Sequence, residues 1–201
     1  MLPKKKPDRW SVFLNVPFDA DYEPLFVGLI ASLVAIGRKP RCVLELPEHV
    51  QGRLFRLFDL IWVCPVSIHD LSRVKPPARF NMPFELGLAV AFFRLGKKRQ
   101  FVMLEEKKFR LQRTLSDLNG YDPGIHGDTI KGVIGCVLSH LGRPTGNPPP
   151  MQVKRLFHEV WKSVPLLKRN YGRKSIFARP IFADLILVAS EFAEAEGLIA
   201  S

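Results

Sequence analysis

One acidic residue, Glu85, stands inside an apolar segment of the chain. Residues 84 to 93 read FELGLAVAFF, and Glu85 is the only charged residue among them. The pattern predicts a largely buried helix with Glu85 in its first turn. Burial raises the pKa of a carboxyl, whereas the positive end of a helix dipole lowers it. A carboxyl under these opposed influences is suited to act as a catalytic acid or base. The structural alternative is that a first-turn glutamate only stabilises a solvated helix end.

Other polar and aromatic residues follow the ends of predicted strands. Ligands of a doubly wound sheet bind outside the carboxyl ends of its strands, so we expect these residues to gather at one edge. They are Asn15, Pro17, Phe18 and Asp19 after the first strand, Glu45 after the second, His69, Asp70, Ser72 and Arg73 after the third, and Phe80 and Asn81 in the loop before Glu85.

These residue types fit a nucleoside or nucleotide. Phe18 and Phe80 could stack on a base or pyridine ring, Asp70 and Asn81 could bind ribose hydroxyls, and Arg73 or Arg79 could meet a phosphate. Each also has a structural alternative, because Asp and Asn often cap helices or turns and Phe is commonly a core residue. A single buried carboxylate opposite ribose-binding groups fits cleavage of an N-glycosidic bond, whose transition state resembles an oxocarbenium ion.

Several other chemistries lack their motifs. The chain has no Gly-x-Gly-x-x-Gly after a strand, no Walker loop and no nucleophile elbow. His69 and Asp70 are adjacent in a predicted strand, so their side chains point to opposite faces and form no dyad. Cysteine and histidine spacings suggest no metal site, and we expect no resident cofactor.

Short β-rich apolar runs alternate with longer helical ones in the first two thirds of the chain. Strands are predicted at 12–16, 41–45, 66–71 and 100–104, and helices at 22–36, around 54–61, after Pro83, at 111–118 and at 130–141. This alternation predicts an α/β fold with a right-handed, doubly wound sheet of four to five parallel strands.

The composition changes after residue 141. Residues 142–150 read GRPTGNPPP, which is too rich in Pro and Gly for regular structure and predicts a linker. We therefore expect an α/β domain at 1–141 and a small helical appendage at 151–201, with helices at 153–167 and about 180–196. The apolar side of the appendage either docks on its own core or forms a dimer contact.

The chain is basic, with 30 Lys and Arg against 19 Asp and Glu and a formal net charge of +11. This charge favours anionic ligands or is a solvated surface, and no nucleic-acid-binding motif accompanies it. Three widely separated cysteines predict reduced, packed thiols. The longest apolar run, 25–36, is too short to span a membrane and predicts a buried helix. We expect a cytoplasmic protein.

Three segments together resemble a known family. They are VFLNVPFD at 12–19, SIHDLSRV at 67–74 and RFNMPFELGLA at 79–89. They are similar to bacterial TIR-like proteins related to nucleoside 2-deoxyribosyltransferases, over roughly residues 10–141. In those transferases the first strand ends in Pro-Phe, a later strand ends in a ligand-binding Asp, and Asp-x-Gly-Thr-x-x-Glu-x-Gly-x-Ala carries the nucleophile. Pro17-Phe18, Asp70 and the segment from Glu85 to Ala89 match these features.

The resemblance implies a flavodoxin-like or TIR-like fold, Glu85 as the catalytic residue, and NAD or a related nucleotide or nucleoside as the substrate of an N-glycosidase. It also implies a role as an anti-phage effector that self-associates and works with a partner protein of a defence system. Asn81-Met82-Pro83 replaces the Asp-x-Gly-Thr of the transferases, which disfavours deoxyribosyl transfer. The alternatives are a non-catalytic nucleotide-binding or signalling module and a nucleoside deoxyribosyltransferase.

Overall fold

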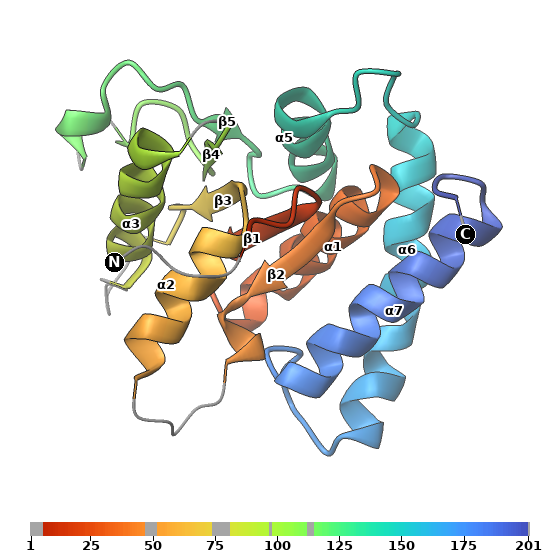
Figure 1. Cartoon of the computed structure of the whole chain (residues 1–201). Helices are drawn as coiled ribbons and strands as arrows, with labels where there is room; N and C mark the ends of the chain where they lie inside the picture. Colours follow the sequence, from red (N-terminus) through yellow and green to blue (C-terminus); the bar gives the residue numbers. More distant parts are fainter. Residues whose placement is uncertain (1–5, 47–51, 74–80, 97, 112–114, 201) are drawn as a thin grey trace. The chain divides into compact units, whose positions relative to one another are not determined.

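Figure 1 shows the computed structural model, which describes residues 6–46, 52–73, 81–96, 98–111 and 115–200. The chain divides into two compact units. The first consists of Met1–Pro17 and Arg41–Ile125, and the second of Phe18–Pro40 and His126–Ser201. This division does not follow the predicted boundaries at 142–150, because the C-terminal helices fall into the same unit as residues 18–40.

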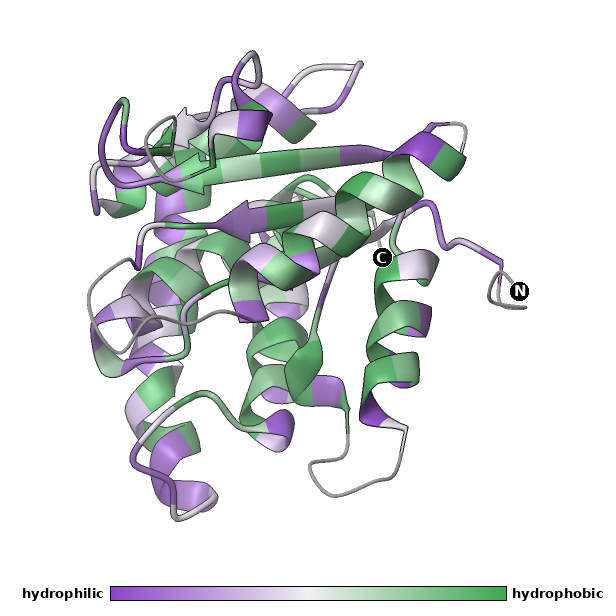
Figure 2. Cartoon of the chain, turned by 90° about the vertical axis from the view of Figure 1, so that its left-hand side faces the viewer, coloured by the Kyte–Doolittle hydropathy of each residue, from purple (hydrophilic) through white to green (hydrophobic). Residues whose placement is uncertain are grey.

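Five strands form one sheet: β1 (Ser11–Asn15), β2 (Lys39–Cys42), β3 (Val66–Asp70), β4 (Gln100–Glu105) and β5 (Gly124–Ile125). The strand order is β2-β1-β3-β4-β5, and the pairs β1–β3, β3–β4 and β4–β5 are parallel. The predicted α/β class with a parallel sheet is therefore confirmed. The order is compatible with a flavodoxin-like fold. Figure 2 shows strands that are hydrophobic over much of their length. Strand β3 ends in the polar residues His69 and Asp70.

Two helices of the first unit, α2 (Arg53–Val63) and α3 (Asn81–Leu95), pack against each other and against β1. Helix α3 also contacts β3 and β4. Their apolar side chains form a core from Phe13, Leu57, Leu60, Ile61, Cys64 and Ala89. This packing fixes α3 next to the carboxyl ends of the central strands, which is the edge where ligands bind in such sheets.

The predicted strand at 41–45 is wrong over most of its length. Strand β2 ends at Cys42, and Val43–Glu45 form a 3-10 turn, η2. The Glu45 carboxylate accepts hydrogen bonds from the Cys42 main-chain N–H at 3.1 Å and from the Arg41 Nε at 2.8 Å. These contacts close the tight turn, so Glu45 has a structural role here. Another 3-10 turn, η3 (Ser116–Leu118), lies within the predicted helix at 111–118.

The second unit is built around α1 (Glu23–Ala35), which follows the short turn η1 (Ala20–Tyr22). Every α1 residue except Pro24 is buried. The helix contacts α5 (Ile130–Leu141), α6 (Pro150–Asn170) and α7 (Arg179–Ala195). Residues Val153, Leu156, Phe157, Val160, Val164 and Leu167 of α6 are buried within this chain. The apolar side of the predicted appendage thus docks on its own chain.

The segment between α5 and α6 is held by side-chain hydrogen bonds. The Asn147 amide donates to the Leu138 carbonyl oxygen at 2.9 Å, and its Oδ1 accepts from the Arg143 main-chain N–H at 2.8 Å. The Arg143 guanidinium donates to the carbonyl oxygens of Ala35 and Leu198. Among the helices of the described residues, none is long and apolar enough to cross a membrane.

Candidate functional site

Glu85 lies on the buried face of α3. It is 5% exposed, and the other buried residues of this helix are Met82, Leu86 and Ala89. The spacing of these positions is that of one helical face, and Glu85 is the only charged residue on it. The neighbouring Phe84 points away and is 48% exposed. The prediction that Glu85 stands in the first turn is wrong, because α3 (Asn81–Leu95) has no acid in its first turn.

Burial dominates the chemistry of the Glu85 carboxyl. Its pKa is raised from 4.5 to about 7, mainly because burial disfavours the charged form. A hydrogen bond from the Asn81 side chain and the positive charge of Arg53 oppose this rise. Two side chains, Asn81 and Arg53, therefore oppose the effect of burial on this pKa. A carboxyl with this pKa changes its charge near neutral pH, as an acid-base or nucleophilic group does.

Asn15 connects the end of β1 to the start of α3. Its side-chain amide donates to the Met82 carbonyl oxygen at 2.8 Å and lies 3.0 Å from His69 Nδ1. The amide is a donor, so His69 Nδ1 is the acceptor and Nε2 carries the proton that faces Ser67 Oγ at 2.9 Å. Both N–H bonds of Asn15 are thus occupied, and a substrate could meet only its side-chain oxygen.

His69 is a fully buried, neutral member of this network. Burial lowers its pKa from 6.5 to about 3. The ring therefore stays uncharged across the physiological range and works by fixed hydrogen bonds. This agrees with the expectation that His69 and Asp70 form no dyad. His69 is a supporting residue rather than a proton donor.

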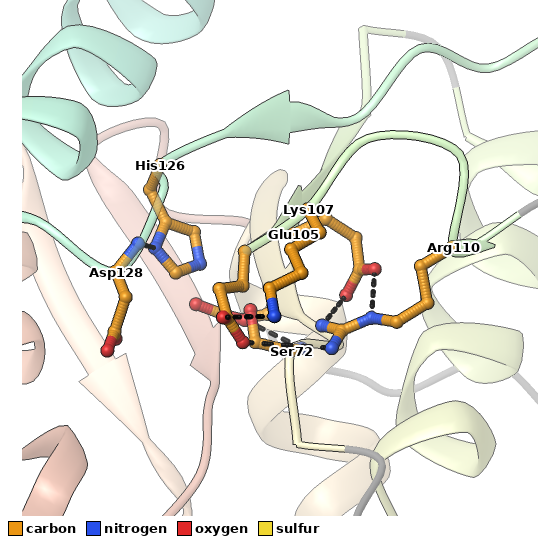
Figure 3. A network of polar contacts seen from close by, with 8 residues as sticks. Ser72, Glu105, Lys107, Arg110, His126 and Asp128 are labelled. Atoms are coloured by element: carbon orange, nitrogen blue, oxygen red, sulfur yellow. Dashed lines mark hydrogen bonds and ion pairs between the residues drawn. The ribbon is translucent and has the colours of Figure 1, made fainter.

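A second polar group lies at the ends of β3 and β4 (Figure 3). Asp70 is fully buried, and its Oδ1 accepts from the Ser72 main-chain N–H at 2.9 Å. Glu105 is 1% exposed and binds Arg110 through two hydrogen bonds of 2.7 and 2.8 Å. Asp70 also acts electrostatically on Arg110 and helps to raise the pKa of its guanidinium. The structure thus brings Asp70 and Ser72 together with an ion pair that sequence reasoning missed.

The signal for Glu105 was present in the sequence. It is the last residue of β4, so it occupies the same edge as Asn15 and Asp70. The run EEKK at 105–108 has the composition of a solvated surface segment, so the sequence does not indicate that Glu105 is buried while Glu106 is half-buried. Arg110 comes from the following loop, and nothing in its spacing predicts the pairing.

The remaining predicted residues are distributed over the chain. Pro17 is buried at the end of the first unit's N-terminal segment, and Arg73 is half-buried after β3. Phe18 and Asp19 belong to the second unit. There Phe18 stacks on Phe177 with ring centroids 4.9 Å apart and meets Phe26 edge-on. Its own chain therefore contacts one face of the ring. Phe80 lies outside the described residues, as does Arg79.

Within the described residues, no group of three or more His, Cys, Asp or Glu side chains is placed to hold a metal ion. Cys42, Cys64 and Cys136 are buried and form no disulfide. Burial raises the pKa of the Cys42 and Cys64 thiols, which keeps them protonated and unreactive. The prediction that the three cysteines are packed in the interior is confirmed.

No family model matches this chain, and comparisons with curated proteins and with solved structures likewise return no match.

Proposed function

We propose that this protein is an N-glycosidase that hydrolyses NAD or a related nucleotide, with Glu85 as the nucleophile or the oxocarbenium-stabilising anion. The observation that supports the proposal is the buried carboxyl on α3, whose pKa of about 7 lets both charge states form near neutral pH. The family resemblance of the segments around Pro17-Phe18, Asp70 and Glu85 adds to it.

The chemistry of NAD suits a site with one carboxyl. The bond between ribose C1′ and the nicotinamide nitrogen breaks, and its electron pair goes to the pyridinium ring, which leaves as neutral nicotinamide. The leaving group therefore needs no proton from an acid. Ionised Glu85 either stabilises the oxocarbenium ion or captures it as an ester. Water then adds at C1′ and releases a proton, giving ADP-ribose.

The positive charge of the substrate also assists Glu85. A cationic nicotinamide ring beside the carboxyl favours its charged form and lowers its pKa from about 7. A neutral purine nucleoside provides no such charge, and its leaving base needs protonation by a second acid. The influences on the Glu85 carboxyl come from Asn81 and Arg53, and neither is an acid. We therefore favour NAD-type substrates over neutral nucleosides.

The other predicted residues take supporting roles in this proposal. Asp70 binds a ribose hydroxyl. Asn81 positions the Glu85 carboxyl through its side-chain hydrogen bond, in addition to or instead of touching ribose. Self-association and action with a partner protein in anti-phage defence belong to the same proposal, and they rest on the family resemblance alone.

One observation favours a non-catalytic nucleotide-binding or signalling module instead. Glu85 is only 5% exposed and already has a hydrogen-bond donor in Asn81, as a sealed structural carboxyl would. The two functions differ in the effect of Glu85→Gln. In an enzyme this change abolishes turnover while the protein stays folded, whereas in a binding module it lowers affinity or has no effect.

The test is mass-spectrometric detection of released nicotinamide or free base from NAD, NADP, nucleosides and nucleotides at high protein concentration. Wild type, Glu85→Gln and Glu191→Gln are compared, since Glu191 is an exposed acid on α7. We expect release by wild type and Glu191→Gln only, with a cooperative thermal unfolding transition showing that all three proteins are folded. Binding without release by wild type would support the signalling module. If wild type shows no binding and no release, both functions are contradicted.

A further inference from the structure

The C-terminal part of α6, the segment that joins it to α7 and the first residue of α7 together carry an unbalanced positive charge in the second unit. We call this stretch the α6–α7 connection. The sequence has no acid between Glu159 and Asp184, and the basic residues in that interval are Lys162, Lys168, Arg169, Arg173, Lys174 and Arg179. Figure 1 shows the two helices side by side and joined by this segment. Such a concentration of one sign of charge attracts anionic partners.

Two of these six cations are neutralised by contacts within the chain. Lys168 Nζ binds the buried Glu23 carboxylate at 2.6 Å, and Lys162 binds Glu159 at 2.7 Å. The others, Arg169, Arg173, Lys174 and Arg179, are exposed and form no ion pair with any residue that the structure describes. Four cations are therefore available to a partner.

The backbone that carries these cations is held by the interior of the second unit. Ile176 is fully buried, and its main-chain N–H donates to the Glu23 carboxylate at 3.1 Å. Phe177 packs against the rings of Phe18 and Phe26. The Arg173 N–H donates to the Lys168 carbonyl oxygen at 2.8 Å. The backbone of the connection is thus anchored at several points, so less backbone entropy is lost when a partner binds.

An aromatic ring stands among the cations. Tyr171 is 40% exposed, and its hydroxyl donates to Asp184 at 2.9 Å. The hydrogen bond fixes the ring while leaving part of it open to solvent. Exposed rings between phosphate-binding cations are the platforms on which single-stranded nucleic acids stack their bases. Three of the four available cations are arginines, whose planar guanidinium groups match phosphate oxygens in pairs.

We propose that the α6–α7 connection binds single-stranded nucleic acid through Arg169, Arg173, Lys174 and Arg179, with Tyr171 stacking on a base. The proposal does not rest on the glycosidase function. It departs from the expectation drawn from missing nucleic-acid motifs, because these exposed cations and Tyr171 form no known sequence motif. An anionic membrane suits the surface less well, because the exposed large apolar residues of this interval are only Leu166 and Tyr171 among the described residues.

The test measures fluorescence anisotropy of a labelled single-stranded oligonucleotide of about 16 nucleotides with the full chain. The variant carries Arg169→Gln, Arg173→Gln, Lys174→Gln and Arg179→Gln. The matched control carries Arg94→Gln, Lys108→Gln, Lys131→Gln and Lys154→Gln, which are exposed positions elsewhere. Both lower the formal net charge of +11 by four. Thermal unfolding checks that each variant is folded. If the four-site connection variant does not fold, the single variants Arg173→Gln and Lys174→Gln are measured in its place.

We expect the connection variant to lose affinity at least about tenfold, and the slope of log affinity against log salt to fall by about 3, as four lost phosphate contacts require. The control should bind like wild type. Tyr171→Ala should weaken binding about fivefold or more, and Tyr171→Phe should not. Three outcomes would overturn the proposal. Both four-site variants could lose affinity equally, the connection variant could keep the wild-type affinity, or wild type could fail to bind the oligonucleotide. Binding to anionic phosphatidylglycerol vesicles without oligonucleotide binding would overturn it in favour of a membrane.

Discussion

The side-chain amide of Asn15 donates a hydrogen bond of 2.8 Å to the main-chain carbonyl oxygen of Met82. Asn15 is the last residue of β1, and Met82 precedes Glu85 by one turn on the same buried face of α3. This bond therefore ties the helix that carries the candidate catalytic acid to the carboxyl edge of the sheet. The Asn15 amide also contacts His69 Nδ1, and the other ring nitrogen of His69 contacts Ser67 Oγ.

Removing the Asn15 amide should destabilise the protein. In Asn15→Ala, the buried His69 Nδ1 loses its donor, and the unfolding free energy should fall by about 1–3 kcal/mol. Urea denaturation measures this change. Asn119→Ala, at an exposed position, should change it by less than about 0.5 kcal/mol. If both variants unfold at the urea concentration of wild type, the Asn15 network contributes no stability.

Glu85 should make the protein less stable as the pH rises. The unfolded carboxyl ionises near 4.5 and the folded one near 7, so between these values the folded state holds more protons than the unfolded state. The stability from this group is fully present below pH 4.5 and is lost as the pH rises through 7. The total loss is about 3 kcal/mol. Urea denaturation from acid to mildly alkaline pH should show this fall in wild type but not in Glu85→Gln. Parallel curves for the two proteins would refute a raised pKa.

Arg53 should tune the Glu85 carboxyl. Its positive charge lowers the pKa of Glu85, so Arg53→Gln should raise that pKa further. The pH at which kcat/KM for nicotinamide release rises should then shift upward. Carbon-13 NMR of the carboxyl reports the same shift even without turnover. Arg56→Gln, at an exposed position on the same helix, is the matched control and should leave the midpoint unchanged. Equal midpoints in both variants would show that Arg53 does not act on Glu85.

The buried Glu105 should depend on Arg110. Arg110→Met leaves a carboxylate that is 1% exposed without its bidentate partner, and should cost about 3–5 kcal/mol of unfolding free energy. Differential scanning calorimetry would show a much lower melting temperature. Lys107→Met removes only the 3.4 Å contact with half-buried Glu106, so its effect should be small. Similar melting temperatures for the two variants would contradict this assignment.

Elements with strong local signals were predicted well from the sequence. The helix expected at 130–141 is α5, because its apolar spacing and the Thr129 cap mark both its face and its start. The pattern around Glu85 predicted a buried acid but not its depth in the helix. The buried face of α3 consists of Met82, Glu85, Leu86 and Ala89, whereas Phe84 is exposed. Packing of the helix against the sheet determines which of these two faces is buried, and the local sequence pattern does not.

Long-range features were not predictable in the same way. The union of residues 18–40 with the C-terminal helices depends on contacts such as Lys168 with Glu23, which are far apart in the chain. The 3-10 turn at Val43–Glu45 replaces a strand because one carboxylate closes it, which no propensity records. The pairing of Arg110 with Glu105 likewise depends on the path of a loop.

The most direct test of the central claim is a time course of nicotinamide release from NAD by wild type beside Glu85→Gln at equal concentration, with both proteins shown to be folded. The proposed function predicts steady release by wild type with equimolar ADP-ribose, and none above background in Glu85→Gln. Equal rates in the two proteins, or no release by wild type, would contradict a catalytic role for Glu85 in cleaving NAD.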